Sequence, residues 1–78
     1  MSQFPSMKTK ELVKCLYRSP LCYKIIRQRG SHRTLRSENY PEIRISYHDR
    51  FEISGFMIRK ILIEEVGLTE ELARKVIK

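Results

Sequence analysis

The segment between residues 22 and 48 contains three short strand-like runs joined by short connections, and this spacing constrains the fold more than any other feature. The runs cover residues 22–29, 32–36 and 42–48, and only Gly30 and Ser31 separate the first two. Glycine adopts a positive φ at little cost, which a tight hairpin turn requires. Parallel strands need a crossover of roughly a dozen residues or more, so these connections predict an antiparallel meander.

Alternating side chains orient the predicted sheet. The third run alternates between an apolar and a polar set, namely Ile43, Ile45 and Tyr47 against Arg44, Ser46 and His48. In the second run, Leu35 and His32 have opposite parity. If Leu35 faces the core, His32 projects from the open face of the sheet, as His48 does. In the first run the adjacent residues Ile25 and Ile26 compete for the core and leave the orientation open.

Helical patterns flank the strands. The first helix is predicted from Thr9, whose hydroxyl can cap it, to about Arg18, where Ser19-Pro20 ends it. Ser54 is predicted to cap a second helix that runs to about Val66, with Gly67 as its C-terminal stop. The buried stripe of that helix is expected at Ile58, Ile61, Leu62 and Val66.

The order of these elements predicts an α+β fold. Thr69 is expected to cap a short C-terminal helix that follows the second helix. A three-stranded antiparallel sheet with helices on one face buries the apolar side of both layers. The resulting α-β-β-β-α order, with a short C-terminal helix, matches the arrangement of double-stranded-RNA-binding domains.

Length and apolar content bound the domain organisation. The chain has 78 residues, of which 41% are hydrophobic, enough for one compact core. We expect a single domain over residues 1–78, with residues 1–6 as a flexible N-terminal extension. No stretch approaches the roughly 20 apolar residues of a membrane span, and residues 1–6 are too short and polar for a signal peptide. We therefore expect a cytoplasmic protein without a membrane partner.

The basic charge is concentrated in the first part of the chain. Sixteen Lys and Arg residues against nine Asp and Glu residues give a net charge of +7. Residues 1–50 hold eleven basic and four acidic residues, whereas residues 51–78 hold five of each. The acid-free segment 24–36 contains Lys24, Arg27, Arg29, Arg33 and Arg36. Such a patch is typical of a protein that binds a polyanion, although a merely solvated basic face has the same composition.

The two cysteines raise the question of redox or metal chemistry. The spacing of Cys15 and Cys22 fits neither a C-x-x-C motif nor a zinc ribbon. We interpret both as buried, reduced thiols. The alternatives are a metal site formed with His32 and His48, or a single disulfide. We expect no metal and no cofactor.

Several segments together resemble the HicA toxins, a family of small messenger-RNA interferases with the fold just described. The central match is Ile26-Arg27-Gln28-Arg29-Gly30-Ser31-His32, which is similar to the family's R-Q-x-G-S-H signature. The likeness begins at Met7-Lys8-Thr9-Lys10-Glu11-Leu12-Val13, continues through Ile58-Arg59-Lys60-Ile61-Leu62 and ends at Val66-Gly67-Leu68-Thr69. The chain departs from the family pattern at Arg33, where many members have a second histidine, and at Phe56-Met57, where many have Gly-Thr.

The resemblance implies the toxin of a type II toxin–antitoxin system, acting in stress responses and inhibited by a HicB-type antitoxin. It assigns the catalytic role to His32. The chemistry suits this assignment, because histidine can take a proton from a ribose 2′-hydroxyl or deliver one to the leaving 5′-oxygen without a metal. His48 is the candidate acid or base partner. RNA contacts are predicted at Lys24, Arg27, Arg29, Gly30, Ser31, Arg33 and Arg36.

Two other functions fit parts of the pattern. A non-catalytic RNA-binding module of the double-stranded-RNA-binding type needs the basic surface but not His32. Such modules usually have a lysine-rich helix start, whereas residues 54–58 are apolar up to Arg59. An inactive relative kept as a protein-binding partner or regulator needs neither. A neighbouring gene for a HicB-like protein and a nuclease assay together distinguish the three.

Overall fold

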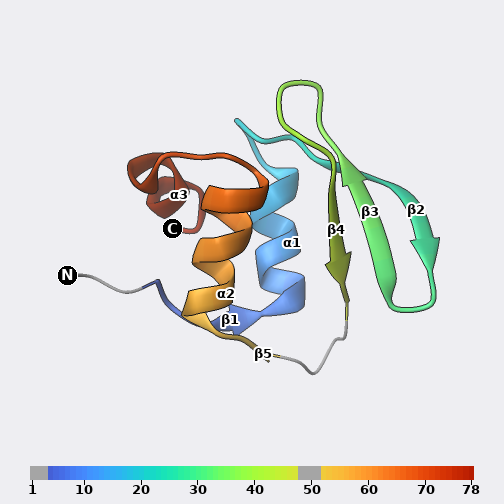
Figure 1. Cartoon of the computed structure of the whole chain (residues 1–78), viewed down its shortest axis with the longest axis horizontal. Helices are drawn as coiled ribbons and strands as arrows, with labels where there is room; N and C mark the ends of the chain where they lie inside the picture. The colour runs from blue at the N-terminus through green and yellow to red at the C-terminus, as the bar shows by residue number, and fades with distance from the viewer. Residues whose placement is uncertain (1–3, 48–51) are drawn as a thin grey trace.

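The computed structural model describes residues 4–47 and 52–78 of the chain. Its main layer is a three-stranded antiparallel sheet in the order β2 (Lys24–Arg29), β3 (His32–Arg36) and β4 (Ile43–Ser46). Helices α1 (Thr9–Tyr17) and α2 (Gly55–Arg59) lie to one side, with β4 nearest to them and β2 at the outer edge (Figure 1). The expected small α+β fold with a three-stranded antiparallel sheet is therefore present.

The observed strands follow the alternation in the sequence. β3 has the predicted bounds, β2 begins at Lys24 rather than at residue 22, and β4 begins at Ile43 rather than at residue 42. The last residue of the third predicted run, His48, lies outside the described residues. Gly30 has a φ of +60° in the turn between β2 and β3. A positive φ at the first turn residue alone is typical of a type II′ hairpin, which explains the glycine.

The helix-facing side of the sheet and the helices form one apolar core. Ile43 and Ile45 of β4 are 4% and 5% exposed, and Leu35 of β3 is completely buried, as the alternation predicts. The predicted stripe of the second helix is buried at all of its positions, Ile58, Ile61, Leu62 and Val66. Fully burying one such side chain stabilises a fold by about 1.5–3 kcal/mol, so this core holds the sheet against the helices.

The first helix begins differently from the prediction. Lys8 rather than Thr9 occupies the N-cap position, and no side chain caps the helix there. Thr9 is instead the first residue of α1, and it is buried. The reason is a short strand, β1 (Met7–Lys8), which pairs with β5 (Glu52–Ile53) and holds Lys8 extended directly before the helix. Nothing in the sequence pattern indicated this two-stranded sheet.

The second helix has the predicted extent but changes geometry within it. After α2 the chain continues as a π-helical segment, η1 (Lys60–Glu65). The amide of Val66 donates to the carbonyl of Ile61 at 2.9 Å, the five-residue spacing of a π-helix. Ser54 caps α2 as predicted, because its hydroxyl accepts a hydrogen bond from the amide of Met57 at 3.3 Å. Gly67, with a φ of +89°, follows the segment at the predicted stop.

Helix α3 (Glu70–Val76) near the C-terminus contacts the N-terminal segment through a side chain. The hydroxyl of Thr69 caps it as predicted, accepting from the amide of Leu72 at 3.1 Å. The guanidinium of Arg74 lies 4.4 Å from the ring centroid of Phe4, which is buried in the core. The backbone of Phe4 also lies so close to Gly55 that a Cβ there would overlap it. Within the expected N-terminal extension of residues 1–6, Phe4 is therefore packed into the core.

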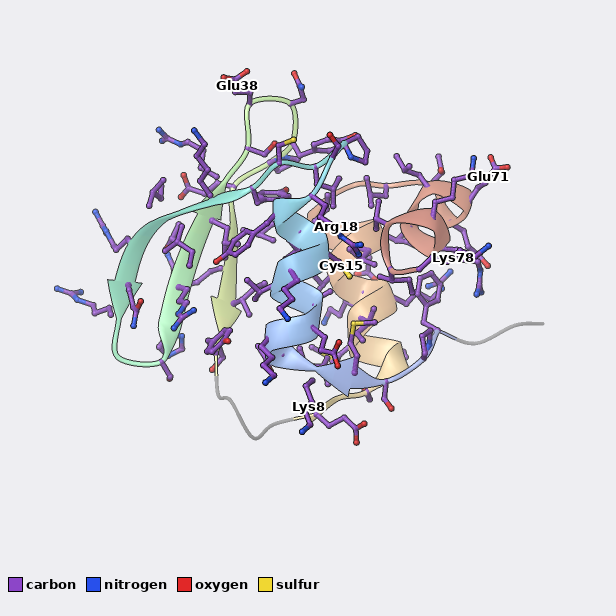
Figure 2. All side chains as sticks on the ribbon, turned by 180° about the vertical axis from the view of Figure 1, so that it is seen from behind. Lys8, Cys15, Arg18, Glu38, Glu71 and Lys78 are labelled. Atoms are coloured by element: carbon purple, nitrogen blue, oxygen red, sulfur yellow. The ribbon has the colours of Figure 1, made fainter. Side chains whose placement is uncertain are left out.

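Both cysteines are free thiols, but only one is buried. Cys15 lies on the buried face of α1, as expected. Cys22, which was also expected to be buried, is exposed and has a φ of +50°. The amide of Cys22 donates to the carbonyl of Arg18 at 2.9 Å, which closes a turn at the surface before β2. Arg18 lies beside Cys15 (Figure 2), and its guanidinium donates a hydrogen bond to the carbonyl oxygen of Val76 at 3.3 Å. This contact links the end of α1 to α3.

Candidate functional site on the open face of the sheet

His32 is the first residue of β3, directly after the Gly30-Ser31 turn, and it is exposed. The sheet register pairs it with Arg29 on β2 and with Ser46 on β4. Because Leu35 on the same strand is buried against the helices, His32 lies on the opposite, open face, as predicted.

The turn before His32 is tied to the end of β4. The amide of Tyr47 donates a hydrogen bond to the carbonyl oxygen of Ser31. A Cβ placed on Gly30 would meet no atom within 4 Å, so the turn conformation, and not crowding, requires glycine there. The space beside Gly30 is open to a ligand. The turn residues therefore border the His32 site without closing it.

A hollow of about 300 Å³ lies next to His32 on the open face. It is lined by Arg27, Arg29, His32, Thr34 and Arg44. These side chains include three guanidinium groups and no carboxylate. No ion pair or side-chain hydrogen bond joins any of the three guanidinium groups to another described residue. A hollow of this composition attracts anions, because nothing in the described chain neutralises its positive charge.

A bulge in β2 brings the basic residues of that strand onto one face. The pairing with β3 shifts between Ile25 and Arg27, so Ile26 is the additional residue. Ile25 pairs with Leu35 on the helix side, whereas Lys24, Arg27 and Arg29 pair with open-face residues of β3. Strict alternation would separate Lys24 from Arg27. The bulge thus resolves the competition between the two isoleucines that the sequence left open.

Arg33, one of the predicted RNA-contact residues, does not lie in the group around His32. It pairs with Gln28 and Ile45, which places it on the helix side of the sheet. Its guanidinium carbon lies 3.7 Å from the ring centroid of Tyr47. Its Nε atom is buried and has no hydrogen-bond partner among the described residues. The physical reason is parity, because consecutive residues of a strand point to opposite faces.

Lys24 and Arg36 lie on the open face but at its other end. They pair with each other, and the Arg36 guanidinium lies 3.6 Å from the Glu42 carboxylate, so part of its charge is balanced. Together with Ile26 they line a separate hollow that also contains Glu38 at the tip of the β3–β4 loop (Figure 2). Of the basic residues predicted to contact RNA, Arg27 and Arg29 are therefore the two that lie in the hollow with His32.

Arg44 is the site residue that sequence reasoning missed. The alternation of the third run placed it on the same face as Ser46, but only the register of β4 against β3 shows that it lies opposite Thr34. His48, the candidate partner of His32, lies outside the described residues. Ser46 is the β4 residue that pairs with His32.

Tyr23 fixes the start of β2 to the loop before β4. Its side chain is buried, and its hydroxyl donates to the carbonyl oxygen of Pro41 at 2.6 Å. Burial, with a smaller contribution from Tyr40, raises the pKa of the Tyr23 hydroxyl to about 12. The hydroxyl therefore remains a donor at neutral pH and anchors the strand that carries Arg27 and Arg29.

In comparisons with known proteins, no family model, curated protein or solved structure matches this chain. Within residues 4–47 and 52–78, no three His, Cys, Asp or Glu side chains form a group that could hold a metal ion. Each helix in the same residues is too short or too polar to cross a membrane.

Proposed function

We propose that this protein is a cytoplasmic endoribonuclease that cleaves messenger RNA and is the toxin of a type II toxin–antitoxin pair. One observation carries the proposal: an exposed histidine lies in a hollow with three arginines and no carboxylate. The resemblance to the HicA toxins supports the assignment of His32 as the catalytic residue. The order of helices and strands supports a double-stranded-RNA-binding-domain-like fold, and a HicB-type protein is the proposed inhibitor.

The proposed reaction is a transfer within the RNA backbone that needs no metal. The ribose 2′-oxygen attacks the adjacent phosphorus, the bond from phosphorus to the 5′-oxygen breaks, and the products carry a 2′,3′-cyclic phosphate and a 5′-hydroxyl. One proton leaves the 2′-hydroxyl and one reaches the 5′-oxygen, and His32 performs one of these two transfers. The guanidinium group of Arg29, which pairs with His32 across β2 and β3, stabilises the charge that develops on the phosphate.

RNA is the substrate because this chemistry requires the 2′-hydroxyl, which DNA lacks. The open face of the sheet, with its hollow beside His32, fits single-stranded or weakly structured RNA. The exposed residues at the start of α2 argue against a double-stranded-RNA-binding module, because Phe56 is 77% exposed and Met57 is 41% exposed where such modules usually carry lysines. A non-catalytic module would use the same arginines and would not depend on His32.

The test is a cleavage assay with purified protein in excess EDTA. We expect cleavage of RNA, no cleavage of DNA of the same sequence, and products that end in a cyclic phosphate. Cleavage of DNA, or complete loss of activity with the chelator, contradicts the mechanism. Expression should also arrest growth, and co-expression of a HicB-type protein should relieve the arrest. Binding of RNA without any cleavage supports the non-catalytic alternative.

A further inference from the structure

The open face carries its side chains in cross-strand rows that the register defines. The rows are Arg29–His32–Ser46, then Arg27–Thr34–Arg44, then the pair Lys24–Arg36. Each row takes one residue from each strand it crosses, and consecutive rows lie two residues apart along β3. The first row contains the proposed catalytic histidine. The second row has an arginine at both ends.

We propose that Arg27, Thr34 and Arg44 form a separate phosphate subsite, which binds the phosphodiester one nucleotide away from the one that is cleaved. The proposal rests on the proposed function, because that function assigns the first row to the scissile phosphate. The ligand of the second row is the backbone of an RNA strand with at least two phosphates, and the row makes no contribution to the chemical step.

The composition of the second row fits a phosphate. Neighbouring strands lie about 4.8 Å apart, so Arg27 and Arg44 flank Thr34 from its two sides. Thr34 has a short, half-buried side chain and leaves room between the two long ones. A guanidinium group can bind two phosphate oxygens at once, and the threonine hydroxyl supplies a further donor. Three donors of this kind can surround one anion.

The spacing of the rows fits successive phosphates. Two residues along a strand span about 6.7 Å, which is similar to the separation of neighbouring phosphates in an extended single strand. With one phosphate beside His32 and the next between Arg27 and Arg44, the RNA backbone runs along β3. Every residue of the first and second rows except Ser46 lines the same hollow, so the two phosphate positions lie next to each other in it.

Charge selects the second row over the third. Arg36 of the third row already lies 3.6 Å from the Glu42 carboxylate. Among the described residues, Arg27 and Arg44 have no acidic partner, and their positive charges repel each other across Thr34. An anion bound between them removes that repulsion. The first and second rows therefore define a site for two consecutive phosphates.

The experiment measures how affinity depends on the length of a non-cleavable RNA. Mixed-sequence 2′-O-methyl dinucleotides and trinucleotides, with one and two phosphodiesters, are titrated against the whole protein and followed by NMR. For wild type we expect the trinucleotide to bind roughly tenfold more tightly than the dinucleotide, the scale of one additional charge-assisted contact set. Arg44→Gln should reduce this ratio to about two, and Thr34→Val, which removes only the hydroxyl, should reduce it less.

The control is Arg59→Gln, which removes the same charge from an exposed position on α2, away from the open face. It should keep the wild-type ratio. Arg27→Gln repeats the test from the other side of the row, should Arg44→Gln fail to fold. An unchanged ratio in the folded Arg44→Gln and Arg27→Gln variants overturns the proposal, as does an equal loss in Arg59→Gln. If Arg44→Gln lowers the ratio of trinucleotide to dinucleotide affinity but wild type does not cleave RNA, the phosphate subsite is supported and the proposed function is contradicted.

Discussion

Strands β2 and β4 are the two edges of the same sheet, yet they are buried very differently. β4 alternates between buried and exposed residues, whereas all six residues of β2 are exposed. Ile26 of β2 is 48% exposed, against 4% for Ile43 of β4. The core therefore sets the register of β4, while backbone pairing with β3 and the anchor at Tyr23 hold β2. The strand that contributes least to the core carries Lys24, Arg27 and Arg29, so the edge that is most buried and the edge that is most basic are different strands.

The largest effect should come from removing an apolar side chain from each edge in turn. Ile43→Ala should lower the free energy of unfolding by about 2–5 kcal/mol, because it leaves a cavity among buried neighbours. Ile26→Ala, the matched change on β2, should alter it by roughly 0.5 kcal/mol. Denaturant unfolding of the two variants provides the comparison. Equal losses at both positions would show that β2 is part of the core after all.

The anchor of β2 gives a smaller effect that depends on pH. Burial raises the pKa of Tyr23 to about 12, so the folded state holds this proton more tightly than the unfolded chain does. The stabilising contribution is present below about pH 10, the ordinary tyrosine pKa, and is lost as the pH rises through about 12. Between these values wild type should lose roughly 2 kcal/mol more stability than Tyr23→Phe. Parallel pH profiles for the two proteins would contradict the burial of this hydroxyl.

The smallest effect concerns salt. If Arg29 contacts one phosphate of single-stranded RNA, and Arg27 and Arg44 together contact the next, log affinity should fall against log salt concentration with a slope of about −1.4. Arg29→Gln should reduce the steepness by roughly 0.7, the value for one contact. Arg33→Gln, on the other face of the same sheet, should leave the slope as it is. A slope that changes in Arg33→Gln and not in Arg29→Gln would place the RNA on the helix-facing side of the sheet.

Local patterns predicted the parts of this fold that depend on local interactions. The caps at Ser54 and Thr69 and the glycine turn before His32 require contacts only within a few residues, and all three are present. The alternation around Leu35 also predicted the face on which His32 lies, because the core side of that strand is unambiguous.

Pairing between distant segments explains the features of the fold that the sequence did not predict. The pairing of β1 with β5 joins segments more than 40 residues apart, and it displaced Thr9 from the predicted cap. Burial of Phe4 beneath Arg74 likewise depends on α3. Arg44 joined the site only through the register of β4 with β3, and the bulge at Ile26 has no signature beyond two adjacent apolar residues. No pattern along a single strand contains this information.

In the proposed function, His32 performs a proton transfer in RNA cleavage from an exposed position. The most direct test compares wild type, His32→Ala and Arg59→Gln for the rate of RNA cleavage in EDTA, with an unfolding curve for each. We expect His32→Ala to lose at least about a hundredfold in cleavage rate, the usual scale for a positioned acid or base. Its stability should stay within roughly 0.5 kcal/mol of wild type, since no apolar group is removed from the core. Cleavage by His32→Ala at the wild-type rate would contradict a catalytic role for His32. A stability of this variant far below that of wild type would show that His32 is a structural residue.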